Sequence, residues 1–249
     1  MCSSDLTDPE LEDGCRLAVQ YQTASVCIKP CAVKRAADLL RGSGVRVGAV
    51  IGFPHGDSKT ESKRYETQLA CQDGAVEIDM VINIGKALSG DWDYVERDIQ
   101  TVCDEAHQRG AKVKVIFEND YLAKGGAGLN SDELKQKLCQ LCERAGADWV
   151  KTSTGYGFVK QPDGNYNYRG ATEHDLALMR AGVSAKVQVK AAGGVRNLDG
   201  LIKVRDLGAT RCGATATAAI LDEYRRRAAA EKAGQAPAAN TGIVGAGGY

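Results

Sequence analysis

Two lysines near the ends of two successive strand-like segments have surroundings that suggest covalent chemistry. Lys151 lies in the sequence DWVKTSTG and Lys190 in VQVKAAGGVR. An ammonium group is rarely buried, because desolvation disfavours its charged form. Apolar strand residues before each lysine and small or glycine-containing turns after it therefore indicate a site that requires a neutral amine. A neutral amine attacks carbonyl carbons, so the first hypothesis is an enzyme that forms a Schiff base.

The charge state of such lysines separates a chemical role from a structural one. An ordinary lysine has a pKa of about 10.4, so roughly one in 2,500 molecules carries the free amine at pH 7. A second cation and an apolar wall can lower such a pKa to about 7, at a cost of about 4.6 kcal/mol. The alternative is that Lys151 and Lys190 form two separate ion pairs with a purely structural role.

An acidic residue inside an apolar strand-like segment offers a partner for proton transfer. Asp79 lies in VEIDMVIN and, by the two-residue period of a strand, shares a face with Glu77 and Asn83. We expect Asp79 to be catalytic and Glu77 to pair structurally with Lys114 of the next strand-like segment. The alternative is that Asp79 itself is the structural partner of Lys114.

Small, glycine-containing loops after three strand-like segments predict a phosphate-binding cradle. Glycine lets backbone N–H groups approach phosphate oxygens, and threonine adds a hydroxyl group. In α/β barrels the loops after strands seven and eight often bind phosphate. The alternative is that these glycines serve turn geometry alone. The predicted cradle consists of Thr154, Gly155, Gly193, Gly194, Val195, Arg196, Gly213 and Thr215.

Alternating strand and helix patterns predict the scaffold that positions these residues. The strand-like runs are 24–30, 45–53, 75–83, 112–118, 149–153, 186–191 and 210–213. The helical patterns are 8–21, 32–42, 59–72, 91–109, 131–145, 172–181, 197–207 and 215–231. Repeated βα units imply a parallel sheet, and eight units imply a barrel. Since only seven strands are found and the chain starts on a helix, we expect an α/β (β/α)8 TIM barrel that lacks its first strand in this chain, through N-terminal truncation.

The domain organisation predicted from these patterns is simple. Residues 1–231 are expected to form a single barrel domain. Residues 232–249 are rich in alanine and glycine and are expected to form a flexible tail. The tail ends in Tyr249, whose hydroxyl group can relay a proton.

Composition argues against several classes of protein. The 249-residue chain has a net charge of zero, which gives no electrostatic support to a nucleic-acid partner. It has no run of 18 apolar residues and no basic-plus-apolar leader, so neither membrane insertion nor secretion is expected. The nine cysteines include Cys139 and Cys142 in a C-x-x-C pair, which lies in a helical pattern without a second pair at zinc spacing. We interpret these cysteines as small core residues of a cytoplasmic protein that needs no metal.

Six segments together carry a family resemblance over roughly residues 8–225, and they are VCIKP, VIGFPHG, EIDMVINIG, VKTSTG, VKAAGGVR and GATRCGAT. They resemble deoxyribose-phosphate aldolases, which are (β/α)8 barrels. This resemblance implies metal-independent class I cleavage of 2-deoxy-D-ribose 5-phosphate to D-glyceraldehyde 3-phosphate and acetaldehyde, without a cofactor. It implies Lys151 as the Schiff-base lysine, Lys190 as the lysine that perturbs it and Asp79 as the proton-transfer partner. By similarity to family members that end in tyrosine, Tyr249 is expected to assist proton transfer.

Three departures from the family pattern accompany the resemblance. The family's opening strand, which carries an active-site carboxylate, is absent from this chain. The KTSTG segment is followed by an extended loop over residues 156–170, on which substrate preference depends, and the last loop has threonines where serines are common. The expected partners are a sugar-phosphate substrate and a second copy of the chain in a homodimer. The alternatives are another Schiff-base sugar-phosphate aldolase or transaldolase, and an inactive sugar-phosphate-binding homologue.

Overall fold

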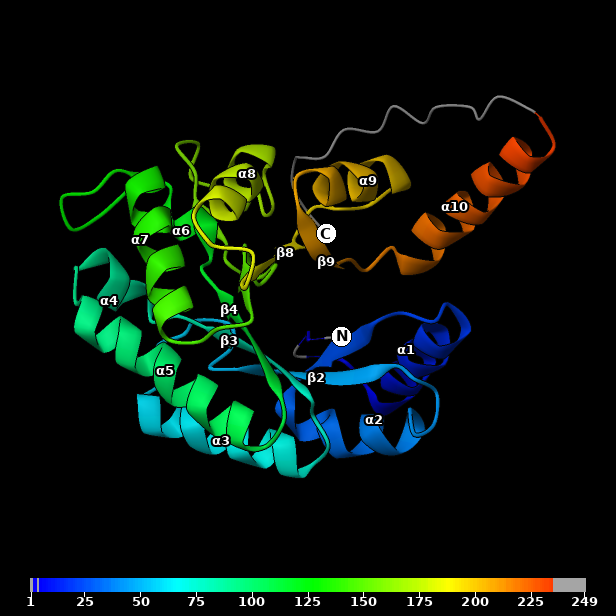
Figure 1. Cartoon of the computed structure of the whole chain (residues 1–249), viewed down its shortest axis with the longest axis horizontal. Coiled ribbons are helices and arrows are strands. Elements are labelled where there is room, and N and C mark those ends of the chain that lie inside the picture. The colour runs from blue at the N-terminus through cyan, green and yellow to red at the C-terminus, as the bar shows by residue number, and fades with distance from the viewer. Residues whose placement is uncertain (1, 4, 235–249) are drawn as a thin grey trace.

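A curled parallel sheet with helices along its outer side forms the body of the protein (Figure 1). The computed structural model describes residues 2–3 and 5–234, so Tyr249 and most of the expected tail lie outside the described residues. Seven parallel strands follow the order β1-β2-β3-β4-β5-β8-β9. Their bounds are Ser25–Ile28, Arg46–Ile51, Glu77–Val81, Lys112–Ile116, Trp149–Lys151, Gln188–Ala192 and Ala209–Gly213. The predicted TIM-barrel class with seven strands is confirmed.

Helices connect the strands and cover the sheet. Every helix expected from the sequence is present, with bounds that differ by a few residues at the ends. The long connecting helices are α1 (Asp8–Gln20), α2 (Val33–Leu39), α3 (Thr60–Gln72), α5 (Trp92–Gln108), α7 (Ser131–Arg144), α8 (Glu173–Ala181), α9 (Leu198–Asp206) and α10 (Thr217–Lys232). Helix α1 begins with a capping box between Thr7 and Glu10, and the Thr172 side chain caps α8. Such capping satisfies N–H groups that have no partner within the helix.

Several short elements were not predicted, because each spans too few residues to show a repeating hydrophobic pattern. They are the 3-10 turn η1 (Pro30–Ala32), α4 (Ile84–Leu88), α6 (Asn119–Leu122) and the hairpin formed by β6 (Val159–Lys160) and β7 (Tyr166–Asn167). The strand expected over residues 75–83 ends at Val81, since Asn83 caps α4 through its side chain. Asn83 therefore does not continue the face of Glu77 and Asp79.

The first and last strands of the described sheet each have one neighbour. Strand β1 pairs with β2, and β9 pairs with β8. Across this opening, the hydroxyl group of Tyr21 donates a 2.8 Å hydrogen bond to Asp222 of α10, and the guanidinium of Arg225 lies 4.7 Å from the Tyr21 ring centre. These exposed side chains connect the two ends of the open barrel on its outside.

One ion pair is completely buried on the outer side of the sheet. Lys63 of α3 donates to Asp98 of α5 at 2.6 Å and to the carbonyl oxygen of Val81 at 2.9 Å. Thr60 adds a 2.8 Å hydrogen bond to the other oxygen of Asp98. This network joins α3 and α5 to the end of β3, which is the strand that carries Asp79.

The cysteine pair of α7 lies in the core, as expected. Cys139 and Cys142 are fully buried, and burial raises the pKa of the Cys139 thiol to about 12. Among residues 2–3 and 5–234, no group of three histidine, cysteine or acidic side chains has the geometry to hold a metal ion. Within the same residues, no helix is both long and apolar enough to span a membrane.

Candidate active site

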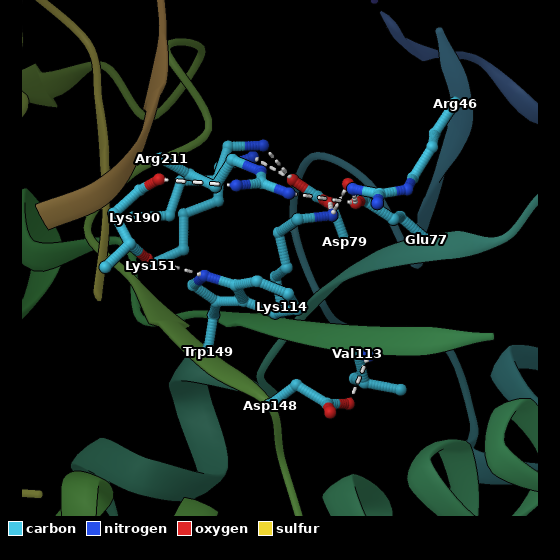
Figure 2. A network of polar contacts seen from close by, with 11 residues as sticks. Arg46, Glu77, Asp79, Val113, Lys114, Asp148, Trp149, Lys151, Lys190 and Arg211 are labelled. Carbon is cyan, nitrogen blue, oxygen red and sulfur yellow. Dashed lines mark hydrogen bonds and ion pairs between the residues drawn. The ribbon is translucent and has the colours of Figure 1, made fainter. Parts of the chain in front are cut away.

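Three lysine ammonium groups converge on one buried carboxylate inside the curled sheet (Figure 2). Lys151 and Lys190 donate to the same oxygen, Asp79 Oδ2, at 2.7 and 2.6 Å. Lys114 donates to the other oxygen, Asp79 Oδ1, at 2.8 Å. Asp79 is fully buried, and Lys151 and Lys190 are 4% and 6% exposed. The two predicted lysines and the predicted carboxylate therefore form one cluster and not two separate ion pairs.

Strand register explains why these side chains meet. Asp79 of β3 lies opposite Lys114 of β4, and Lys151 of β5 lies opposite Lys190 of β8. Directly opposite residues in neighbouring parallel strands point to the same face of the sheet. Because the sheet curls, the long lysine side chains of β5 and β8 reach across the interior to β3 (Figure 2). The interior of this barrel thus contains a layer of charges where apolar side chains usually pack.

A second carboxylate extends the cluster. Glu77 lies 2.7 Å from Lys114, and the guanidinium groups of Arg46 and Arg211 lie 3.7 and 3.6 Å from it. The expected Glu77–Lys114 pair is confirmed, and Lys114 also binds Asp79, which was the alternative pairing, so both carboxylates share this lysine and the catalytic role of Asp79 stays a prediction. The ring of Trp149 lies 5.5 Å from both Lys114 and Arg211 and forms an apolar wall on this side.

The charges of the cluster favour an ionised Asp79 beside a charged Lys190. Burial raises the pKa of Asp79, but Lys114, Lys151 and Lys190 outweigh this effect and hold it well below its ordinary value. Burial lowers the pKa of Lys190, but the negative charge of Asp79 outweighs this effect and raises the pKa above its ordinary value. Lys190 therefore stays charged. Two carboxylates thus face three lysines and two arginines.

Hydrogen bonds fix the ends of the two lysine strands to each other. Thr152, which follows Lys151, donates through its hydroxyl group to the carbonyl oxygen of Ala192 at 2.9 Å and accepts from its N–H at 3.0 Å. Thr152 is fully buried, so this contact is protected from water. It sets the position of the loop after β5 relative to the loop after β8.

The loop after β8 meets the end of the 156–170 segment. The N–H of Ala171 donates to the carbonyl oxygen of Gly193 at 3.1 Å. A Cβ atom on Gly193 would lie 3.0 Å from the Cα atom of Gly170, and Gly193 has a φ of +89°. Turn geometry and close approach therefore both require glycine at this position.

The remaining residues of the predicted cradle lie at or after the carboxyl ends of β5, β8 and β9. Gly194, Val195 and Arg196 lead into the N-terminus of α9, which Asn197 caps. A Cβ atom on Gly213 would lie 3.7 Å from Lys190 Cε, and Thr215 is exposed before α10. Thr154 and Gly155 follow β5, where the Thr154 side chain binds Glu118. This arrangement does not test whether these residues bind phosphate, so the cradle stays a prediction.

A small cavity opens beside the site. It has a volume of about 180 Å³ and lies between the loops after β1 and β2 and the loop after β5. Lys29, Val50, Phe53 and Tyr156 contribute to its lining. The Phe53 and Tyr156 rings contact each other edge to face at 5.6 Å.

Two features of the site were missed from the sequence. Glu118, at the end of the fourth predicted strand, is 1% exposed and binds the loop that follows Lys151. Arg211 binds Glu77 from β9. The sequence signal for Glu118 was an acidic residue directly after apolar residues. The signal for Arg211 was its position in the two-residue alternation of the last strand.

Comparison with known proteins identifies the family. Residues 1–223 match the family described as DeoC/LacD family aldolase. The chain belongs to the DeoC/LacD aldolase family. A family relative from Rhodopirellula baltica, named deoxyribose-phosphate aldolase, is 49% identical over 222 residues, which cover 89% of this chain and 85% of the relative. One from Thermococcus gammatolerans with the same name is 44% identical over 213 residues, covering 85% of this chain and 87% of the relative.

Solved structures agree with this family assignment. A protein from Coccidioides immitis superimposes with a TM-score of 0.80 at 34% identity, covering 90% of this chain and 82% of that one. The tetrameric deoxyribose phosphate aldolase of Aeropyrum pernix superimposes with a TM-score of 0.76 at 27% identity, covering 90% and 87%. The seven-stranded barrel of this chain therefore agrees with its assignment to the aldolase family.

Proposed function

We propose that this family member cleaves 2-deoxy-D-ribose 5-phosphate reversibly to D-glyceraldehyde 3-phosphate and acetaldehyde through a Schiff base on Lys151. One observation carries the proposal. Lys151 and Lys190 share a single carboxylate oxygen in a buried site of an aldolase-family barrel. Relatives named for this activity share 43–49% identity with the chain over most of its length.

Lys151 starts the reaction as a neutral amine. Its nitrogen attacks the carbonyl carbon of the open-chain sugar, and loss of water gives an iminium ion. A base removes the proton from the hydroxyl group on the third carbon, and the bond between the second and third carbons breaks. The electron pair of that bond moves toward the iminium nitrogen and leaves an enamine, while glyceraldehyde 3-phosphate departs. Protonation of the enamine and hydrolysis release acetaldehyde and free Lys151.

Asp79 and Lys190 control protons around this nitrogen. Charged Lys190 disfavours a second ammonium group on the same oxygen, which promotes the neutral form of Lys151. Ionised Asp79 lies within 2.7 Å of the reacting nitrogen and can exchange protons with a water molecule or a substrate hydroxyl. Lys114 and Glu77 hold Asp79 in place from the other side.

The predicted phosphate cradle supplies binding energy away from the reacting bond. The loops after β8 and β9 and the N-terminus of α9 lie at the same end of the sheet as Lys151. Backbone N–H groups at a helix N-terminus favour a phosphate group. Binding the phosphate there orients the sugar, so that its carbonyl carbon stays within reach of Lys151.

The decisive experiment measures acetaldehyde release from 2-deoxy-D-ribose 5-phosphate and traps the intermediate. Borohydride added with acetaldehyde should attach a two-carbon unit to the peptide that contains Lys151. Lys112, which is exposed and paired with Asp148, is the internal control and should carry no label. Label on another lysine would refute the assignment, and cleavage of fructose bisphosphate in place of the deoxy sugar would favour a different aldolase. Binding without any cleavage would favour the inactive homologue.

A further inference from the structure

Glu118 is a buried carboxyl group that the proposed reaction does not use. It follows β4 and has a left-handed backbone conformation with a φ of 56°, which turns its side chain away from the direction that strand alternation predicts. It is 1% exposed. Lys151, the proposed Schiff-base lysine, is the last residue of the neighbouring strand β5. Glu118 therefore lies next to the loop that follows Lys151.

Both polar hydrogens of Thr154 point at one oxygen of Glu118. The N–H of Thr154 donates to Glu118 Oε2 at 3.1 Å, and the Thr154 hydroxyl group donates to the same oxygen. The hydroxyl oxygen also accepts a 2.9 Å hydrogen bond from the N–H of Tyr156. Its own proton is therefore directed to Glu118, and the carboxyl group holds Thr154 to Tyr156 in one conformation.

The second oxygen of Glu118 has no hydrogen-bond partner among the described residues. Glu118 Oε1 is buried beneath Gly157, where an added Cβ atom would lie 2.7 Å from it. A buried carboxylate oxygen without a donor is costly, whereas the protonated acid leaves a neutral hydroxyl group there. The closed loop therefore favours the protonated form of Glu118. The ionised form is stabilised when the loop opens and water reaches Glu118 Oε1.

Charges around Glu118 add little to this balance. Burial raises the pKa of Glu118 to about 7, the hydrogen bonds from Thr154 lower it, Asp120 of α6 raises it and Lys151 of β5 lowers it. Burial raises the pKa of the Tyr121 phenol of α6, and the nearby Glu118 carboxyl group adds to this effect. Desolvation is thus the main reason that Glu118 holds a proton near neutral pH.

We propose that Glu118 is a positioning residue whose protonated side chain clamps the Thr154–Gly157 segment beside the lysine cluster, and that loss of this proton releases the segment. The segment contains Thr154 and Gly155 of the predicted phosphate cradle and reaches Phe53 through Tyr156. The clamp therefore controls how well the site holds the phosphate end of its substrate. This link to catalysis rests on the proposed function, but the proton-dependent clamp itself does not.

Amide hydrogen exchange tests the clamp without substrate. In the open loop Glu118 regains an ordinary carboxyl pKa of about 4.3, so closing takes up a proton between that value and about 7. The contribution of this proton to closure is complete below about pH 4.3, is still large at pH 5 and is lost as the pH rises through about 7. Corrected for the intrinsic exchange rate, protection of the Thr154 and Tyr156 amides should fall about 100-fold between pH 5 and pH 8.

Two variants make the result decisive. Glu118→Gln stays neutral at every pH, so protection of both amides should not depend on pH. Glu61→Gln alters an exposed residue of α3 and should keep the wild-type dependence. Equal protection of the wild-type amides at both pH values would overturn the proposal. The same is true if the pH dependence persists in Glu118→Gln.

Kinetics test the link to the proposed reaction separately. The ratio of wild-type KM to Glu118→Gln KM for deoxyribose 5-phosphate should rise between pH 6 and pH 8, with a smaller change in the ratio of kcat values. A constant KM ratio in an active enzyme would refute the link to catalysis. If the wild type cleaves no deoxyribose 5-phosphate, the proposed function fails, while the exchange experiment still decides the clamp.

Discussion

Replacing Lys190 by leucine tests the electrostatic basis of the proposed catalysis. The substitution removes one of two ammonium groups that share Asp79 Oδ2 but keeps much of the side-chain volume. Asp79 retains Lys114 and Lys151 as partners, so its charge stays compensated. We therefore expect a folded protein in which the neutral form of Lys151 is harder to reach.

The structure gives the size of this effect. The two lysine nitrogens lie 2.7 and 2.6 Å from the same oxygen. That geometry places them at most about 5.3 Å apart, where two unit charges repel by at least about 3 kcal/mol at an effective dielectric constant of about 20. At about 1.4 kcal/mol per pH unit, this repulsion corresponds to more than about two pH units. In Lys190→Leu the free amine at pH 7 should decrease by a factor of about 100 to 1,000.

The assay is the pH dependence of kcat/KM for acetaldehyde release. In Lys190→Leu the acidic limb of the profile should move two to three units toward alkaline pH, and activity should partly recover above pH 9. Lys190→Arg keeps the charge and should leave the limb near its wild-type position. Lys112→Leu removes an exposed lysine that pairs with Asp148 and is the matched control for loss of a lysine. An unmoved acidic limb in Lys190→Leu would refute the assignment of Lys190 as the perturbing cation.

Three further outcomes are expected. Asp79→Asn leaves buried lysines without their carboxylate and should lower the free energy of unfolding at pH 7 by about 3–5 kcal/mol. Because the folded state depresses the pKa of Asp79, its contribution is present above about pH 4 and is lost as the pH falls through the folded value, so denaturation curves of wild type and variant should converge in acid. Lys63→Met strands buried Asp98 and should cost about 3–5 kcal/mol, whereas Lys63→Met with Asp98→Leu should recover most of it; equal stability of the single and double variants would contradict this. If Tyr249 assists proton transfer, Tyr249→Phe should lower kcat with little change in KM or Tm, and full activity after deletion of residues 240–249 would exclude that role.

The sequence predicted the strands and the two lysines because each leaves a local signal. A lysine between apolar strand residues and a glycine turn is visible in the segments around Lys151 and Lys190. Their meeting on one oxygen of Asp79 was not predictable, because it depends on the register of β3, β5 and β8 and on the curl of the sheet. For the same reason Lys114 was assigned to Glu77 alone.

Glu118 shows a different limit of sequence interpretation. Residues 112–118 form one predicted strand with an acidic end, and strand alternation would place that end by parity. The left-handed backbone at Glu118 breaks the alternation and turns the carboxyl group toward Thr154. Nothing in the residue type indicates this conformation, since glutamate has no preference for positive φ.

The shared oxygen of Asp79 has a consequence for the course of the proposed reaction. An ammonium ion and an iminium ion carry the same charge, so replacing one by the other at the Lys151 nitrogen keeps the total charge of the buried cluster constant. Ionised Asp79 compensates either cation, with no rearrangement of Lys114 or Glu77. Charged Lys190 repels either cation, so the same repulsion that promotes the free amine also favours conversion of the iminium ion to the uncharged enamine, which is the step that breaks the carbon–carbon bond.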